Sequence, residues 1–388
     1  MKRVPQLDGI RGIAILLVLL WHYVGVQIMD KSGALTVLNM ALGFSWSGVD
    51  LFFVLSGFLI AGILIDHRDA SNYFRVFYLR RVCRILPLYL LLLAVFVCFS
   101  GTAIASEERF RWLFAKPFPL WAYLTFTQNV FMSFRGWFGA NFVGITWSLA
   151  IEEQFYLLMP ALVYFLPRKT RWYVFLPGIL LAPILRLVLP GFHAFVLTPW
   201  RADSLLCGVC LAMLVRSPRA WAFVEKRKRF LLLLFVGLLA GAVLIPWRPG
   251  GPLTHTWLAA LYSVFILIAL LNPDGRMGRL LKRQLLVWLG IWSYGIYMFH
   301  EPVFGLLSGF VRGQAPALNT IADVGVVGLA LVLTILIAAL SHKFFEQPIL
   351  QLGHRFRYIN TPPSPQIALT DAPTPVEGVL QSPAPEPI

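Results

Sequence analysis

The chain has 388 residues, of which 58% are hydrophobic and only 13% are charged. A soluble domain carries about 25% charged residues, so this composition excludes an ordinary water-soluble globule and predicts an all-α integral membrane protein. The formal net charge is +15, from 33 Lys and Arg against 18 Asp and Glu. Such a surplus indicates a nucleic-acid partner in a soluble protein, but a membrane protein collects basic residues on its cytoplasmic loops.

Ten apolar stretches have roughly the 20 residues that a helix needs to span a bilayer core. They lie at about residues 9–29, 47–65, 84–101, 147–167, 172–190, 197–215, 230–247, 252–271, 285–307 and 321–342. The first is not read as a cleaved secretory signal, because Trp21 and His22 stand where a small-residue cleavage site would fall. We therefore expect about ten transmembrane helices.

The basic residues alternate with these stretches. With the amino terminus inside, 23 Lys and Arg lie on segments predicted to be cytoplasmic and 7 on segments predicted to be outside. This asymmetry predicts a multi-pass protein of the inner membrane with both termini cytoplasmic, and it explains the charge without nucleic acid.

Two segments are expected to lie outside the bilayer. Residues 102–146 are predicted to form an extracytoplasmic loop, because a further span at 117–134 would invert every later loop. Residues 1–348 then form the membrane domain and residues 349–388 a cytoplasmic tail. From about residue 361 the tail holds eight prolines and no basic residue, which predicts disorder.

Ionisable residues within the spans are costly in lipid and are therefore functional candidates. Arg11 and His22 are 11 residues apart, about three helical turns plus 20°, so they share a face and lie about 16 Å apart. Glu152 lies about 8 Å into the fourth stretch, near the level of His22. A carboxylate can orient a histidine for general-base catalysis, so His22 and Glu152 are the catalytic candidates. The alternatives are an anchoring role for Arg11, a packing role for His22 and a helix-start preference for Glu152.

Further polar residues are expected at the same level, where they would line a polar chamber in the outer third of the bundle. The candidates for the chamber or for an acceptor site are Asp50, Glu153, Arg201, Asp203, Tyr297 and His300, with Arg186 and Glu301 nearby. For each residue alone, an ion pair or an interfacial anchor explains its position as well.

On the cytoplasmic side, Arg81 and Arg84 share a helix face at the start of the third stretch, where they suit a phosphate or mark cytoplasmic orientation. Ser56 and Gly57 fall near mid-membrane, where small residues allow close helix packing or the passage of a thin ligand. Cys207 and Cys210 are expected to be packing residues, and no metal site is predicted.

Seven segments in order resemble the membrane-bound type 3 acyltransferase family, which includes O-acetyltransferases of bacterial glycans. They are LDGIRGIA from Leu7 on to His22, GVDLFFVLSGF from Gly48, RVCRILPLY from Arg81, TWSLAIEEQFY from Thr146, RADSLLCG from Arg201, SYGIYMFH from Ser293 and FEQP from Phe345. The resemblance covers residues 7–348, essentially the whole membrane region.

The resemblance implies transfer of an acyl group, usually acetyl, from cytoplasmic acyl-CoA to a hydroxyl of an extracytoplasmic or lipid-linked carbohydrate. It implies essential roles for Arg11 and His22, importance for Arg81 and Arg84, and a preference for Glu152 over Glu153. Acyl-CoA is the expected co-substrate, held by Arg11, Arg81, Arg84 and Ser56, with no permanently bound cofactor. The esterase-like domain of many members is not expected here, so transfer is direct or is completed by a separate extracytoplasmic transferase.

The expected mechanism threads the thioester to His22, which Glu152 orients and which deprotonates the acceptor; a transient acyl-histidine is the variant. A transporter or flippase of a lipid-linked glycan is the rival interpretation, although the sequence shows no convincing internal repeat. A sensor that holds anionic lipid is a third, which leaves the outer histidines and acids unexplained. The acceptor, the acyl length and the oligomeric state are not visible in the sequence.

Overall fold

The computed structural model describes residues 4–28, 42–245 and 250–359, and these residues form helices and no strand. A helix lies at each of the ten predicted stretches. These helices are α1 (Pro5–Leu20), α4 (Gly48–Asp66), α5 (Tyr73–Ser100), α11 (Trp147–Phe165), α12 (Thr170–Val188), α14 (Ala202–Val215), α16 (Lys228–Leu244), α17 (Thr254–Leu271), α19 (Gln284–Arg312) and α20 (Ile321–Ser341).

Among the described residues, six helical segments are long and apolar enough to cross a membrane, or seven if α14 and the bent α15 (Pro218–Glu225) form one span. The six are Pro5–Gly25, Leu42–Asp66, Tyr73–Ser100, Thr170–Val188, Thr254–Leu271 and Ile321–Arg355. Of the others, α16 has only 17 residues, and α11 and α19 carry polar groups such as Glu152 and Glu301. The protein is therefore an all-helical membrane protein, while ten spans and cytoplasmic termini remain predictions.

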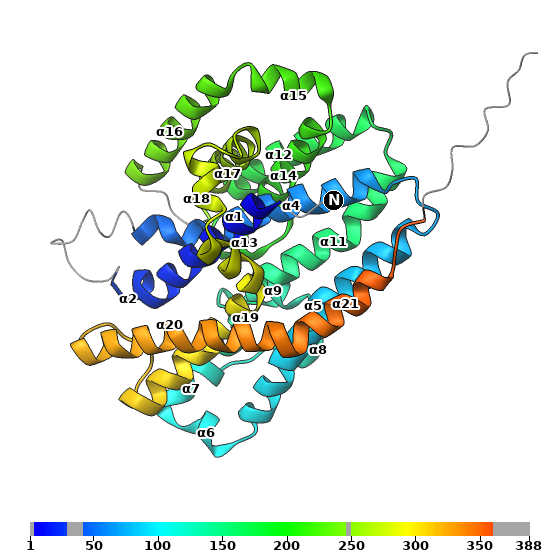
Figure 1. The fold of residues 1–388 in the computed structure, drawn as a ribbon. Helices are drawn as coiled ribbons and strands as arrows, with labels where there is room; N and C mark the ends of the chain where they lie inside the picture. The colour runs from blue at the N-terminus through cyan, green and yellow to red at the C-terminus, as the bar shows by residue number, and fades with distance from the viewer. Residues whose placement is uncertain (1–3, 29–41, 246–249, 360–388) are drawn as a thin grey trace, which may run out of the picture.

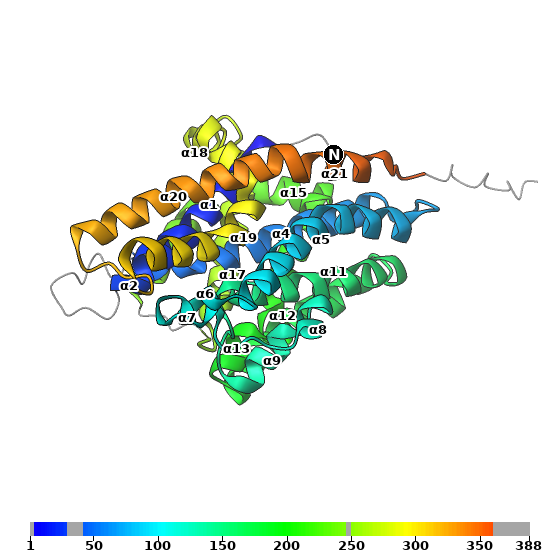
Figure 2. The same ribbon diagram turned by 90° about the horizontal axis from the view of Figure 1, so that it is seen from below.

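The long helices form a bundle with α1 and α4 in its middle, as Figures 1 and 2 show. α16 and α20 lie on opposite sides of the bundle in Figure 1. At one end, the last residue of α4, Asp66, accepts two hydrogen bonds from Arg216, which follows α14 (2.6 and 2.7 Å). Arg68 of the same end donates to the carbonyl of Tyr164 near the end of α11. We call this the arginine end of the bundle.

Residues 102–146 hold short helices and no long one. They are α6 (Ala103–Ser106), α7 (Glu108–Phe114), α8 (Leu120–Leu124), α9 (Gln128–Arg135) and α10 (Asn141–Gly144). α7 packs against α19 near the end opposite to the arginine end, and α10 leads into α11.

The first residues of the predicted tail are helical. α21 (Gln347–Arg355) continues from α20 and packs along α5, where Arg80 donates two hydrogen bonds to the carbonyl of Phe356 (2.9 and 2.6 Å). The Pro-rich segment from residue 361 lies outside the described residues.

Glycine contacts hold α1 and α19 at backbone distance. A Cβ atom at Gly12 would lie 2.1 Å from the carbonyl oxygen of Leu286, and one at Gly290 would lie 1.8 Å from that of Asp8. Small residues allow helix backbones to approach this closely in a membrane, where packing replaces the hydrophobic effect as the main attraction. The α1–α19 pair therefore has one close and defined register.

Helices α4 and α14 also approach each other closely through glycines. A Cβ atom at Gly57 would lie 2.0 Å from the carbonyl oxygen of Leu205, and one at Gly208 would lie 2.1 Å from that of Val54. Of the two roles considered for the Ser56–Gly57 pair, Gly57 serves close packing.

Replacing Gly290 by Ala should destabilise the bundle, because the new methyl group collides with the backbone of Asp8 and the two helices must separate. We expect a lower melting temperature in detergent, measured by size-exclusion chromatography after heating. The matched control is Gly325→Ala on α20, where a Cβ atom meets nothing within 4 Å. Since Ala favours a helix over Gly by about 1 kcal/mol, this control should be neutral or stabilising. Equal stability of the two variants would contradict the packing argument.

Candidate functional site

A cavity of about 290 Å³ lies between α1, α4, α5, α11 and α19. Its apolar wall comes mainly from α4, and its polar groups come from all five helices. The polar lining residues, tyrosines included, are Arg11, Ser56, Arg81, Arg84, Ser148, Glu152, Tyr156, Ser293, Tyr294 and Tyr297. We call it the central cavity.

The central cavity brings together the three arginines that the sequence singled out. Arg11 lies on α1, where its guanidinium is 3.5 Å from the carboxylate of Asp8, and Arg81 and Arg84 lie on α5. The Nε atom of Arg81 is buried and has no hydrogen-bond partner among the described residues. Its guanidinium lies 5.8 Å from the centre of the Tyr156 ring. Three cations that line one cavity, one of them with an unused buried donor, favour an anionic ligand.

Glu152 also lines the central cavity. It accepts a hydrogen bond from the hydroxyl of Tyr156 (3.0 Å), and this hydroxyl also bonds to that of Ser56. Tyr156 was not among the sequence candidates, although its i+4 spacing from Glu152 puts both on one helix face. Glu153 does not line the cavity, and its Oε1 atom is buried without a hydrogen-bond partner. The predicted chamber role of Glu153 is therefore not reproduced.

His22 lies beside α19 rather than in the cavity wall. It stands in a π-helical turn, Trp21–Gly25, that interrupts the regular geometry after α1. The His22 Nε2 atom is 3.7 Å from Glu301 Oε1, and the ring centres of His22 and His300 are 4.8 Å apart. Tyr23, next in the same turn, donates to the carbonyl of His300 (3.0 Å). π-Turns within α-helices are frequent at functional sites because they redirect single side chains.

Backbone carbonyls set the tautomers of both rings. His22 Nδ1 lies 2.9 Å from the carbonyl of Val18, and His300 Nδ1 lies 2.7 Å from that of Tyr297. Since a carbonyl can only accept, each neutral ring carries its proton on Nδ1 and has a free lone pair on Nε2. The His300 Nε2 atom has no hydrogen-bond partner among the described residues. We call His22, His300 and Glu301 the histidine cluster.

The ligand atoms of the histidine cluster lie within 4.8 Å of one another, and two imidazoles with a carboxylate are a possible metal set. Zinc–nitrogen bonds of about 2.0 Å place tetrahedral ligands only about 3.3 Å apart, so the cluster would have to contract to hold this ion. Without contraction, the same groups can accept and hold a proton.

The carboxylate beside His22 is thus Glu301, whereas the sequence hypothesis paired His22 with Glu152. Among the described residues, no hydrogen bond and no ion pair within 4 Å joins His22 to Glu152. Tyr297 connects the two places: its hydroxyl bonds to Ser148 in the cavity wall (2.7 Å), and its ring centre is 5.5 Å from that of His300. The histidine cluster therefore adjoins the central cavity across Tyr297.

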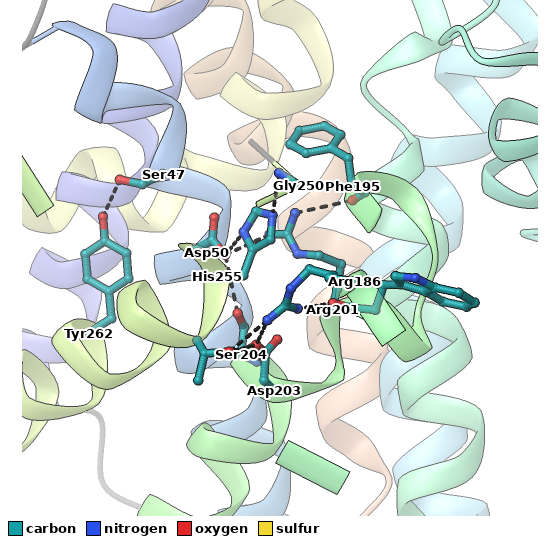
Figure 3. A network of polar contacts seen from close by, with 12 residues as sticks. Ser47, Asp50, Arg186, Phe195, Arg201, Asp203, Ser204, Gly250, His255 and Tyr262 are labelled. Carbon is teal, nitrogen blue, oxygen red and sulfur yellow. Dashed lines mark hydrogen bonds and ion pairs between the residues drawn. The ribbon is translucent and has the colours of Figure 1, made fainter. Parts of the chain in front are cut away.

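Other residues predicted for the chamber form a separate, closed network. Figure 3 shows Asp50, Arg186, Arg201, Asp203 and His255 pointing toward one another from α4, α12, the turn before α14, α14 and α17. Asp50 pairs with Arg201 (2.8 Å) and His255 (3.0 Å), and Arg186 pairs with Asp203 (2.6 Å). We call these five residues the buried ion-pair network.

The buried ion-pair network has no open side for a ligand, because its side chains are 0–1% exposed. The expectation that Asp50, Arg201 and Asp203 line a chamber with His22 is therefore not reproduced. The network lies behind the cavity wall, since the guanidinium of Arg201 is 5.2 Å from the ring centre of Phe53, which lines the central cavity. His255 was missed by the sequence reasoning; its only signal was an imidazole in the first turn of an apolar stretch.

Comparison with known proteins agrees with this arrangement of motifs. The family model described as "Acyltransferase domain" matches residues 4–342. The chain is 28% identical over 382 residues to the peptidoglycan O-acetyltransferase OatA of Listeria monocytogenes, covering 91% of this chain and 56% of that protein. It is 28% identical over 385 residues to the O-acetyltransferase OatA of Staphylococcus aureus, covering 91% and 58%. The chain therefore spans little more than half the length of these relatives.

No solved structure matches the chain. The family match extends over most of the membrane region and includes Arg11, His22, Arg81, Arg84, Glu152 and Glu301. The chain belongs to the acyltransferase domain family that its motifs resemble, the membrane-bound type 3 acyltransferases.

Proposed function

We propose that this chain transfers an acetyl group from acyl-CoA to a hydroxyl of an extracytoplasmic or lipid-linked carbohydrate. The observation that carries the proposal is the order of groups along the bundle. An arginine-rich cavity at the arginine end adjoins, across Tyr297, a cluster in which two imidazole rings each keep a free lone pair on Nε2. The protein acts in the inner membrane, with the arginine end on the cytoplasmic side, where the basic loops are predicted.

The central cavity is the donor site in this proposal. The phosphates of CoA bind Arg11, Arg81 and Arg84, because guanidinium groups form strong charge-assisted hydrogen bonds with phosphate. Arg11 and His22 are about 16 Å apart along the helix, a distance that the extended pantetheine arm can cover. Ser56 and the apolar residues of α4 line its path. Acyl-CoA is a co-substrate here, and no permanently bound cofactor is needed.

The histidine cluster supplies the proton transfer. The Nε2 atom of His22 takes the proton of the acceptor hydroxyl, and the oxygen attacks the thioester carbonyl. The tetrahedral intermediate collapses to the ester, and the CoA thiolate leaves and takes the proton back from His22. Glu301, which lies 3.7 Å from the same nitrogen, stabilises the imidazolium once it forms, a role that the sequence hypothesis gave to Glu152, while the Val18 carbonyl holds the ring through Nδ1. The products are an O-acetylated carbohydrate and free CoA.

The names of the relatives support a carbohydrate acceptor, since one is a peptidoglycan O-acetyltransferase. Delivery is direct or is completed by a separate extracytoplasmic transferase. The rival function is a flippase for a lipid-linked glycan, which predicts movement of the glycan without any new acyl group.

The purified protein in liposomes should move radiolabel from acetyl-CoA to a cell-envelope glycan fraction. His22→Ala should lower this transfer by at least about 100-fold, the lower range for a lost general base, while CoA binding persists. Movement of unlabelled glycan by the wild type, with no label incorporated, would instead identify a flippase. Full activity of His22→Ala would exclude the mechanism.

Arg81→Ala should weaken acetyl-CoA binding. Hydrogen bonds to charged groups contribute about 1.5–3 kcal/mol, so the KM for acetyl-CoA should rise roughly 10- to 100-fold with a smaller change in kcat. The matched control is Arg75→Ala, which removes an exposed arginine from the same helix, α5. Equal effects of the two variants would show that only the general positive potential matters.

Two isosteric variants distinguish the carboxylates. Glu301→Gln should lower kcat by about 100-fold or more with little change in the KM for acetyl-CoA, because it removes the charge beside His22. Glu152→Gln should act mainly on the KM for acetyl-CoA, since Glu152 lies in the cavity wall. If Glu152→Gln instead lowered kcat and Glu301→Gln raised the KM, the orienting role would belong to Glu152.

A further inference from the structure

A second cavity lies among the short helices of residues 102–146, away from the arginine end. This cleft has a volume of about 440 Å³ and is lined chiefly by Glu108, Arg111, Trp112, Lys116, Trp137 and Asn141. We call it the aromatic cleft. Neither the resemblance nor the proposed mechanism uses it.

The aromatic cleft is held in shape by its backbone. Lys116 adopts φ +56°, a left-handed conformation that is rare for a residue with a side chain, and the neighbouring wall residue Gly139 has φ +76°. The side-chain amide of Asn141 donates to the carbonyl of Trp112 (2.9 Å) and ties two walls together. Strained backbone persists where the surrounding structure enforces it, and it concentrates at functional sites.

The cleft stands close to the histidine cluster. A Cβ atom at Gly305 of α19 would lie 2.9 Å from Cζ3 of Trp112, so this indole packs directly on α19. Gly305 follows Glu301 by four residues, about one helical turn or 6 Å. Along α19 the order is therefore the central cavity at Tyr297, the histidine cluster at Glu301 and the aromatic cleft at Gly305. A ligand in the cleft approaches His22 from the side away from the arginines.

The lining indicates the chemistry of the ligand. Indole faces such as those of Trp112 and Trp137 are suited to pack against the C–H face of a pyranose ring, while Asn141 and Arg111 carry groups that can bond sugar hydroxyls. Arg111 is paired with Glu108 (3.0 Å), whereas the ammonium of Lys116 lies 4.8 Å from the centre of the Trp137 ring. Two cations against one carboxylate among the named residues favour an anionic group beside the sugar.

We propose that the aromatic cleft binds the acceptor as a saccharide that carries a carboxylate or phosphate next to the ring stacked on Trp137. This inference rests on the proposed function, which identifies the bound glycan as the acceptor. It adds the place of binding and the acidic character of the ligand.

Equilibrium binding without any acyl donor tests the cleft independently of transfer. The probes are tetragalacturonate for the carboxylate, a phosphorylated mannose oligosaccharide for the phosphate and cellotetraose as the neutral reference, with tryptophan fluorescence as the readout. The wild type should bind at least one acidic probe about tenfold or more tightly than cellotetraose. Binding of none of the probes, or preference for cellotetraose, would overturn the proposal.

Two variants and one control locate the binding. Trp137→Ala should weaken binding of the preferred probe about tenfold. Lys116→Gly should remove the preference for acidic probes over cellotetraose. Glycine adopts the left-handed backbone of Lys116 without strain, so this second variant keeps the fold. Trp121→Ala removes an exposed tryptophan of α8 that does not line the cleft, and it should bind like the wild type. An equal loss of probe binding in all three variants would overturn the proposal. Loss of acetyl transfer with normal probe binding would leave the cleft intact and count against the proposed chemistry alone.

Discussion

The close approach of α1 and α19 determines where the chemistry of this protein can occur. Helices packed through large side chains keep their axes about 8–10 Å apart. Gly12 and Gly290 instead bring backbone against backbone, because neither carries a side chain at the contact. His22 projects from the helical segment that continues α1, and His300 and Glu301 project from α19. The glycine contacts lie two to three helical turns from the histidine cluster, and they bring its residues on the two helices together.

Much of the fold was predictable from residue order, because lipid requires a membrane-spanning helix to be long and mostly apolar. Each of the ten apolar stretches coincides with a helix, and the stretch at residues 102–146 contains none of comparable length. The convergence of Arg11, Arg81 and Arg84 on one cavity was also within reach, whereas Glu152 was expected at the level of His22 and lies with these arginines instead. Their positions along the spans are set by helical rise, which a sequence displays directly.

The pairing of side chains was less predictable, since helical rise gives depth in the membrane but not the direction in which a helix faces. Asp50 and Arg201 were expected near His22 because of their depth, yet they point into another set of helices. The π-turn at Trp21–Gly25 adds a residue to one helical turn, so the regular spacing of 100° per residue that was used to place His22 does not hold through it. No local pattern in the sequence reports that extra residue, so Glu301 was overlooked as the partner of His22.

The buried ion-pair network also constrains how the chain enters the bilayer during synthesis. Arg201 and Asp203 at the start of α14 are costly in lipid while they lack partners, and their partners lie on α4 and α12. Both helices precede α14 in the chain, so the acceptor for Arg201 and the donor for Asp203 are already made when α14 emerges. His255, the remaining member, follows on α17 and closes the network. The order of residues along the chain therefore allows Arg201 and Asp203 to be neutralised as they arrive, whereas Asp50 and Arg186 lack these partners until α14 is made.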